Sequence, residues 1–148
     1  MLDDLKSLRE KTGAGIMDVK KALEEAKGDV KKAEEILKAR GVAIAEKKSD
    51  RATSQGLIDA YIHMGKVGVM VEVACETDFV SRNDEFKKFV HEIALQAATS
   101  EAENAEKLLQ EDYFRDPSKK ITDLLNEVIA KTGENIKIKR FVKYSLGE

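Results

Sequence analysis

The sequence has very little cysteine and histidine, and this scarcity excludes several kinds of chemistry. Its 148 residues include one cysteine and two histidines. A single cysteine cannot form an intrachain disulfide or a thiolate metal site. His63 and His91 lie far apart in the sequence and match no metal-binding spacing such as HExxH. We therefore predict no metal centre and no cofactor.

Long hydrophobic runs are also missing. The longest apolar stretch, Val67 to Ala74, is interrupted by Gly68 and Glu72. It is far shorter than the roughly 20 apolar residues that a membrane-spanning helix needs. The N-terminal residues 1–4 show no apolar signal core. We therefore expect a soluble, cytoplasmic protein with no membrane contact.

No strong excess of either charge is present. The formal net charge is −2, although 36% of the residues are charged and 42% are hydrophobic. This composition is sufficient for a modest core and is unlike that of a disordered chain. Binding to nucleic-acid phosphates depends on clustered, uncompensated Lys and Arg, and acidic residues lie near most of the basic runs here. We therefore expect protein partners and no nucleic acid.

Residues 1–41 are predicted to form a domain of three short helices. Glycine residues separate three stretches of helical apolar spacing, with Gly13 after the first, Gly28 after the second and Gly41 closing the third. Asp29 is placed to cap the third helix. The apolar positions are Leu5, Leu8, Val19, Ala22, Leu23, Ala26, Val30, Ala33, Ile36 and Leu37. A unit with so small a core is typical of a docking module rather than of an enzyme.

Residues 42–56 lose the apolar period and are rich in charged and polar side chains, which indicates a linker that can be helical at its start. Beyond it, alternation predicts a β-hairpin. Ile58, Ala60 and Ile62 alternate with more polar residues, residues 64–66 form the turn, and valines line one face of the second strand. An amphipathic helix over residues 86–97 is then expected to cover the apolar face of the hairpin.

The rest of the predicted second domain, residues 57–148, completes a small α+β core. Residues 101–111 are compatible with a continuing helix, and Pro117 interrupts the segment that follows them. A further helix ends at Thr132 and Gly133. The chain ends in a third strand, residues 136–144. Its alternation slips between Ile138 and Phe141, which predicts a β-bulge. We predict two layers, with helices packed on a three-stranded antiparallel sheet.

Two features that suggest catalysis have simpler structural explanations. Cys75 lies between Glu72 and Glu76, and acidic neighbours raise the pKa of a thiol, so core packing is favoured over nucleophilic catalysis. The segment Gly13–Gly15 lacks both the preceding strand and the following Lys-Ser/Thr of a phosphate-binding loop. We interpret it as a tight turn between helices.

The segment Cys75–Asn83, between the second strand and the next helix, is the uncommon feature of this sequence. Ser81 followed by Asp84 resembles a helix capping box, and Val80 or Phe79 suits the hydrophobic staple before it. A segment at this place also lies at the tip of the rigid core. Residue spacing alone therefore does not decide whether this segment is a structural helix cap or a functional loop.

Three segments resemble the bacterial elongation factor Ts family. Residues 8–23, LREKTGAGIMDVKKAL, are similar to the N-terminal signature of that family. Residues 72–82, EVACETDFVSR, are similar to its second signature, and the segment from Lys131 to Phe141, beginning KTGENI, resembles its core-closing strand. The three segments occur in the family's order and reach from one end of the chain to the other.

The resemblance implies a ubiquitin-associated-like N-terminal domain and a guanine-nucleotide exchange factor for the GTPase elongation factor Tu, without covalent catalysis. It implies that Arg9, Ile16 and Met17 face the nucleotide-binding domain of the GTPase. It also implies a segment that displaces the magnesium ion of the GTPase, consisting of Thr77, Asp78, Phe79 and Val80. In this interpretation the Phe79 ring wedges beside the magnesium site, and Asp78 competes there electrostatically.

The chain departs from the longer members of the family in one place, and two alternative functions remain open. Longer members of the family carry a second core subdomain and a helical hairpin, whereas only residues 100–118 occupy that place here. Short members can pair and a small sheet leaves an open edge, so we expect a homodimer. One alternative is an adaptor in which residues 1–41 bind a helix or a nascent chain. The other is a thiol-dependent enzyme that uses Cys75.

Overall fold

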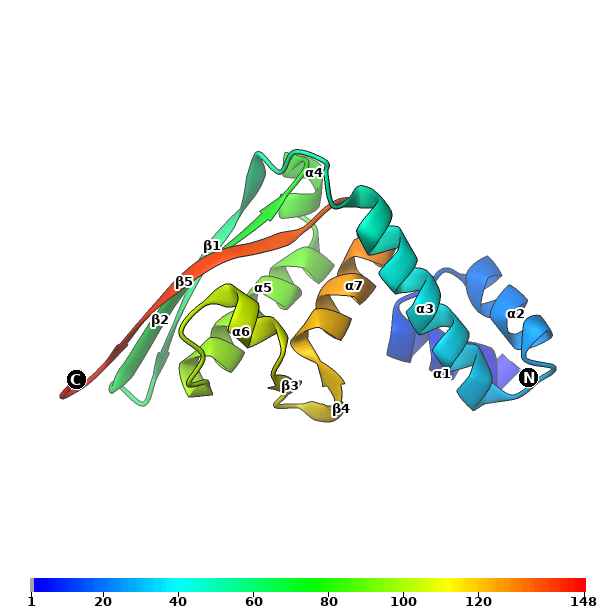
Figure 1. Ribbon diagram of the computed structural model, residues 1–148, viewed down its shortest axis with the longest axis horizontal. Helices are drawn as coiled ribbons and strands as arrows, with labels where there is room; N and C mark the ends of the chain where they lie inside the picture. The colour runs from blue at the N-terminus through cyan, green and yellow to red at the C-terminus, as the bar shows by residue number, and fades with distance from the viewer. Residues whose placement is uncertain (1) are drawn as a thin grey trace.

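Three helices open the chain in the computed structural model, which describes residues 2–148. They are α1 (Leu2–Thr12), α2 (Ile16–Glu25) and α3 (Val30–Lys48). Their apolar faces meet in a hydrophobic core of their own, formed by Leu8, Val19, Ala22, Leu23, Ala26, Ala33 and Leu37. The predicted N-terminal helices are confirmed. They lie at one end of an elongated molecule, and the sheet lies at the other end (Figure 1).

Helix α3 begins as predicted but does not end at the predicted residue. The Asp29 carboxylate caps it by accepting hydrogen bonds from the backbone N–H groups of Lys31 at 3.0 Å and Lys32 at 3.2 Å. The expected stop at Gly41 is wrong, because the helix continues to Lys48. A Cβ atom at Gly41 would lie 3.9 Å from the backbone oxygen of Asn126, so this glycine lies where the helix packs closely on a neighbour. The start of the proposed linker 42–56 is therefore helical, and the domain boundaries stay a prediction.

The predicted three-stranded antiparallel sheet is confirmed. Strands β1 (Gln55–His63), β2 (Val67–Cys75) and β5 (Lys137–Ser145) lie in the order β1-β2-β5. The predicted bulge is present as well. Glu72 pairs with Arg140 and the next residue, Val73, pairs with Ile138, which leaves Lys139 as the extra residue of β5.

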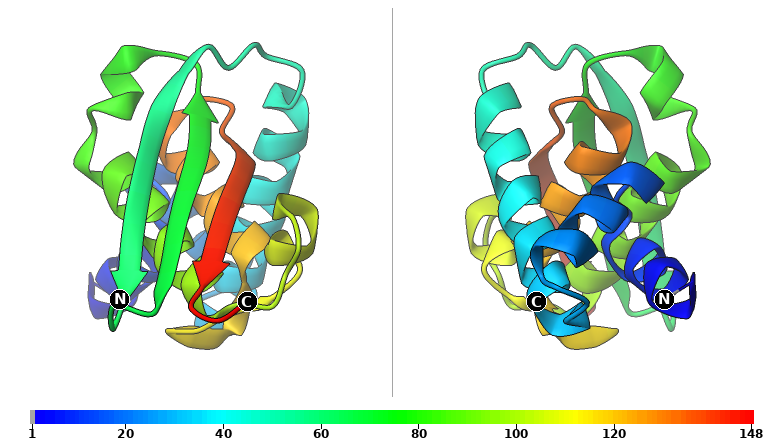
Figure 2. Two further views of the ribbon diagram at one scale, coloured as in Figure 1. Left: turned by 90° about the vertical axis from the view of Figure 1, so that its left-hand side faces the viewer. Right: turned by 90° about the vertical axis from the view of Figure 1, so that its right-hand side faces the viewer.

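One face of the sheet carries the main core. Helices α5 (Asp84–Thr99) and α7 (Ile121–Thr132) pack on this face, which confirms the two-layer α+β prediction. The left-hand view of Figure 2 shows that no helix lies over the opposite face. The core side chains include Val69, Val71, Val73, Phe86, Phe89, Val90, Ile93, Ile121, Ile129, Ile136 and Ile138. The sheet thus buries one side and leaves the other open.

Strand β1 packs on the helices with the opposite face from the one expected. Ile58 and Ile62 are exposed, whereas Leu57 and Tyr61 pack against the main core. The pairing register explains this result, because Tyr61 lies opposite the buried Val69 and must share its side of the sheet. The predicted packing of Ile58 and Ile62 against the helix is therefore wrong.

The segment between α5 and α7 contains short elements that the sequence did not reveal. Helix α5 ends at Thr99, so the helical continuation considered for residues 101–111 is wrong; α6 (Ala105–Leu109) is a separate short helix. Strands β3 (Asp112–Tyr113) and β4 (Asp116–Lys120) form a small hairpin. Helix α7 ends at Thr132 and Gly133, as predicted, and Gly133 adopts the left-handed conformation there. No helix within residues 2–148 has both the length and the apolar character to span a membrane.

Candidate functional site

The segment after β2 forms a one-turn helix, α4 (Asp78–Ser81), which lies at the top of the molecule in Figure 1. Thr77 caps it, because its hydroxyl oxygen accepts a hydrogen bond from the backbone N–H of Val80 at 3.3 Å. Helix α5 has a separate cap, in which the Asn83 side chain accepts from the backbone N–H of Glu85 at 2.8 Å.

The predicted capping box of Ser81 and Asp84 is wrong. Ser81 belongs to α4, and its hydroxyl donates to the backbone oxygen of Asp78 at 2.9 Å instead of capping α5. Two consecutive caps, at Thr77 and Asn83, replace the single one that was expected. Helices α4 and α5 therefore each begin after a residue that supplies a side-chain cap.

The four residues assigned to magnesium displacement differ sharply in exposure. The Phe79 side chain is 82% exposed, whereas Val80 is buried in the main core. Asp78 is exposed in the first turn of α4, and its carboxylate lies 3.5 Å from the Arg82 guanidinium. Asp78 and Phe79 thus present a carboxylate and an aromatic ring to the outside, while Thr77 and Val80 hold the turn in place. Their role toward a partner stays a prediction.

Glu134, in the turn between α7 and β5, fixes the start of this segment. One of its carboxylate oxygens accepts from the backbone N–H groups of Glu76 and Thr77, each at 3.0 Å. The other accepts from the Thr77 hydroxyl at 2.6 Å. Hydrogen bonds to an ionised acceptor are stronger than neutral ones. Sequence reasoning missed this residue, although it lies in the KTGENI segment whose resemblance had been noted.

Asn135 attaches the same segment to the chain before β1. Its backbone N–H donates to the Glu76 carboxylate at 2.7 Å. Its buried side-chain amide donates to the backbone oxygens of Ser49 at 3.3 Å and Arg51 at 2.7 Å. The backbone that leads into α4 is therefore held from two sides, by groups from distant parts of the sequence.

Cys75 lies just before α4 in an environment that disfavours a thiolate. Its side chain is fully buried, and burial, followed by the negative charge of Glu134, raises the pKa of the thiol to about 11. The thiol donates to the backbone oxygen of Thr77 at 3.2 Å. A nucleophilic cysteine needs the opposite conditions, which are partial exposure and a lowered pKa.

The residues predicted on the N-terminal helices lie on a second surface. Ile16 and Met17 are 51% and 61% exposed at the start of α2. Both line an open groove of about 870 Å³ between α1 and α2, together with the apolar side chains of Leu5 and Leu23. Arg9 is exposed on α1 but does not line this groove. Helix α4 lies elsewhere, beyond α3 (Figure 1).

Both histidines have local partners. His63 Nδ1 lies 2.9 Å from the Tyr61 hydroxyl, and His91 Nδ1 lies 3.0 Å from an Asp59 carboxylate oxygen. Across residues 2–148, no group of His, Cys, Asp and Glu side chains is arranged to hold a metal ion.

This fold presents apolar side chains at two separate places on ordered helices, which defines the class of an α+β protein suited to binding another protein. Comparisons with known proteins then identify its family. The family described as "Elongation factor TS" matches residues 76–148. The chain is 47% identical to an elongation factor Ts from Coprothermobacter proteolyticus, with 97% of this chain and 96% of that protein covered. The chain belongs to the elongation factor Ts family and has a role in translation elongation.

Other relatives agree with this assignment. An elongation factor Ts from Thermoanaerobacter pseudethanolicus is 45% identical, with 97% of this chain and 93% of the relative covered. Another from Thermotoga neapolitana is 42% identical, with 99% and 97% covered. The alignment to the first of these runs over 190 positions, although this chain has 148 residues. The relative therefore carries residues inside the aligned region that this chain lacks.

Proposed function

We propose that this chain is the guanine-nucleotide exchange factor of elongation factor Tu. It binds the GDP form of this GTPase in the cytoplasm, promotes GDP release and so allows GTP to bind. The observation that carries the proposal is Phe79, which is 82% exposed on a helical turn, and Glu134 holds the backbone that leads into this turn. An aromatic anchor on an ordered turn is a favourable contact, because little conformational freedom is lost when it docks.

The mechanism depends on how translational GTPases hold their nucleotide. A phosphate-binding loop and a magnesium ion that bridges protein and phosphate oxygens hold the GDP. Phe79 enters an apolar slot beside that site and shifts the loops that position the ion. Asp78 brings an exposed carboxylate to the same region, where it competes for the groups that neutralise the phosphates. The GDP leaves intact, so exchange requires no covalent step.

Thermodynamic linkage fixes the other half of the cycle. If the exchange factor lowers the affinity of the GTPase for GDP, GDP lowers the affinity for the factor by the same ratio. Incoming nucleotide therefore releases the factor, and one molecule acts on many GTPase molecules in turn.

The groove between α1 and α2 supplies a second contact in this proposal. Ile16 and Met17 present apolar surface to the nucleotide-binding domain of the same GTPase. An adaptor that uses its N-terminal helices alone has no need for a fixed, exposed Phe79. Replacing that residue therefore separates the two functions.

Stopped-flow release of fluorescent GDP from elongation factor Tu tests the role of Phe79. We expect Phe79→Ala to slow the stimulated release by about tenfold or more, because truncating a docked aromatic anchor costs roughly 2 kcal/mol. Phe114→Ala is the matched control, since Phe114 is also an exposed phenylalanine but lies on the β3–β4 turn. A Phe79→Ala protein as fast as the parent would refute the wedge.

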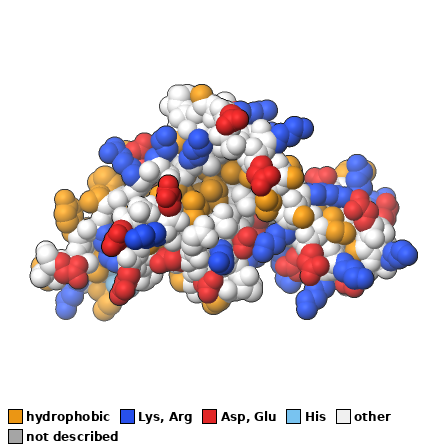
Figure 3. All heavy atoms as spheres, viewed as in Figure 1, with side chains coloured by type: hydrophobic (Ala, Val, Ile, Leu, Met, Phe, Trp, Pro, Cys, Tyr) orange, Lys and Arg blue, Asp and Glu red, His pale blue; other side chains and the backbone are white. Residues whose placement is uncertain are grey.

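We also propose that the protein forms a homodimer through the uncovered face of its sheet. Hydrophobic side chains gather at the sheet end of the molecule in Figure 3. The exposed apolar side chains of this face are Ile58, Ile62, Met70, Val142 and Tyr144. An ion pair of Glu72 and Arg140 lies among them. Clustered exposed apolar side chains are typical of an interaction surface, and two such sheets can pack face to face. A second copy of the chain is the partner with the matching surface.

A further inference from the structure

The N-terminal helices and the sheet have separate hydrophobic cores, and helix α3 belongs to both. Ala33 and Leu37 lie in the first core, whereas Ile44 and Ala45 pack against the second. This continuous helix restrains how the two parts are oriented. Contacts beside α3 add to that restraint.

Lys119, on β4, connects α1 with the sheet-bearing part. Its ammonium donates to the backbone oxygen of Lys11 at 2.8 Å and to a carboxylate oxygen of Glu127 at 2.8 Å. Lys11 lies in the last turn of α1, where backbone oxygens have no partner within the helix. A positive charge is favourable at this end of a helix. The Lys119 side chain is only 22% exposed, so water screens these contacts weakly.

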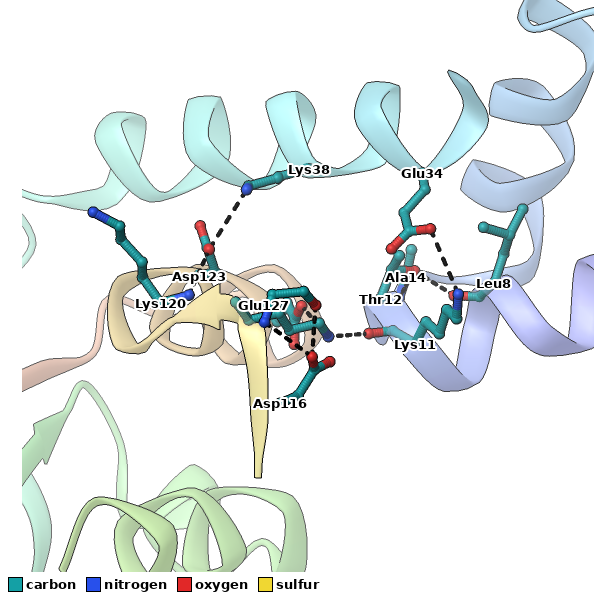
Figure 4. A network of polar contacts seen from close by, with 12 residues as sticks. Leu8, Lys11, Thr12, Ala14, Glu34, Lys38, Asp116, Lys120, Asp123 and Glu127 are labelled. Carbon is teal, nitrogen blue, oxygen red and sulfur yellow. Dashed lines mark hydrogen bonds and ion pairs between the residues drawn. The ribbon is translucent and has the colours of Figure 1, made fainter. Parts of the chain in front are cut away.

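A second polar contact joins α3 to α7. The Lys38 ammonium lies 3.5 Å from the Asp123 carboxylate (Figure 4). Between this pair and Lys119 lies a cavity of about 110 Å³ that residues of both parts line, among them Leu37 and Glu127. Helix α3 packs closely on α7 at Gly41, but this packing leaves part of the junction unfilled, and charged groups line that part.

The surroundings of Glu127 show what Lys119 contributes. Burial, followed by the nearby charges of Asp123 and Asp116, raises the pKa of the Glu127 carboxyl, and the Lys119 ammonium opposes this change. Without Lys119, the carboxylate loses its cation and the Lys11 carbonyl loses its donor. Both losses weaken the attachment of α1 while the two hydrophobic cores stay intact.

We infer that Lys119 is a positioning residue that fixes the N-terminal groove of Ile16 and Met17 relative to Phe79, so that both reach one partner together. This inference rests on the proposed function, in which both surfaces contact the same GTPase. Once one of two linked contacts has formed, the second gains from the high effective concentration that a suitable link gives it. If the junction at Lys119 is loosened, the effective concentration of the second contact falls, although the groove and Phe79 themselves are unchanged.

A distance measurement tests the junction without any partner. Spin labels at Lys21→Cys and Lys87→Cys, both exposed, report the separation of α2 and α5 in a Cys75→Ala background. We expect one narrow distance distribution for the Lys119 protein and a broadened or shifted one for Lys119→Ala. Lys107→Ala is the matched control, because it removes an ion pair of Lys107 with Glu103 that lies on the α6 side of the molecule. An unchanged distribution for Lys119→Ala overturns the inference.

GDP release from elongation factor Tu supplies the functional measurement. We expect Lys119→Ala to raise the factor concentration for half-maximal stimulation about tenfold, with little change in the maximal rate because Phe79 is intact. Lys119→Arg keeps a cationic donor and should give a half-maximal concentration close to that of the parent. It also provides the comparison with the parent if the alanine variant is poorly folded. Equal half-maximal concentrations for parent and Lys119→Ala refute the inference but leave the proposed function standing. A parent that does not accelerate GDP release refutes the proposed function, and the distance distributions still decide the role of Lys119.

Discussion

At the scale of single residues, the candidate site depends on a carboxylate far from it in the sequence. Glu134 accepts three hydrogen bonds from Glu76 and Thr77 and so orders the backbone that leads to Phe79. A hydrogen bond to a charged group contributes about 1.5–3 kcal/mol, less when it is exposed. The exposed ring of Phe79 thus relies on a half-buried carboxylate that belongs to a different turn of the chain.

Replacing Glu134 should therefore weaken exchange without touching Phe79. We expect Glu134→Ala to slow stimulated GDP release by about tenfold and to lower the free energy of unfolding by about 1–3 kcal/mol, because three donors lose their acceptor. Glu134→Gln keeps one acceptor oxygen and should fall between parent and alanine variant. Stopped-flow kinetics and urea denaturation measure the two effects. Glu103→Ala, which removes a surface carboxylate paired with Lys107, should match the parent in both.

The raised pKa of Cys75 makes a prediction about alkaline pH. Its thiol has a folded-state pKa of about 11 against an ordinary value of 9.0, so the folded protein holds this proton more tightly than the unfolded chain does. The resulting contribution to stability is fully present below pH 9 and is lost as the pH rises toward 11. We expect the free energy of unfolding to fall less steeply between pH 9 and 11 in Cys75→Ala than in the parent. Parallel curves from urea denaturation would contradict this prediction.

Only part of the candidate site was accessible from the sequence. The position of the exposed segment followed from the resemblance, and the exposure of Phe79 agrees with the role assigned to it. The contribution of Glu134 could not be predicted, because spacing within one segment says nothing about acceptors brought there by the tertiary fold. The two separate caps at Thr77 and Asn83 were missed because α4 is a single turn, too short for an apolar period.

At the scale of helices and strands, the sequence predicted the long elements well and their faces less well. Val69, Val71 and Val73 identified the buried side of β2 directly. In strand β1, both faces carry some apolar side chains. Only the pairing with β2 decides which of the two faces packs against the helices. The stop expected at Gly41 failed because a glycine within a helix costs only about 1 kcal/mol relative to alanine, which packing against α7 can offset.

The pairing of β1 with β2 depends on the absence of a side chain at Gly56. A Cβ atom at this residue would lie 2.2 Å from the backbone oxygen of Val73, and its φ of +153° disfavours other residues as well. We expect Gly56→Ala to lower the free energy of unfolding by about 2 kcal/mol or more, because backbone of the neighbouring strand must move. Gly68→Ala is the matched control in β2, where an added Cβ meets nothing within 4 Å. Equal urea midpoints for both variants would contradict the prediction.

At the scale of the whole molecule, the two proposed interactions use different surfaces. The uncovered sheet face lies at one end of the elongated molecule, and the groove between α1 and α2 lies at the other (Figure 1). Phe79 extends from α4, outside the set of side chains on the uncovered face. A dimer through the sheet therefore leaves both contacts for the GTPase available, so each interaction can be removed by itself.

Light scattering at micromolar concentration tests the dimer. We expect a mass twice the 16.5 kDa of the chain, because all three strands expose apolar side chains on the uncovered face, beside the ion pair of Glu72 and Arg140. Ile62→Lys combined with Met70→Lys should give a monomer, since two closely spaced positive charges on each copy cannot be buried against those of the other. Ile16→Lys is the control, because it places a lysine at an exposed isoleucine of the N-terminal groove and should leave the dimer unchanged. A parent protein with the mass of one chain, or an Ile16→Lys protein that dissociates as well, would exclude the sheet face as the interface.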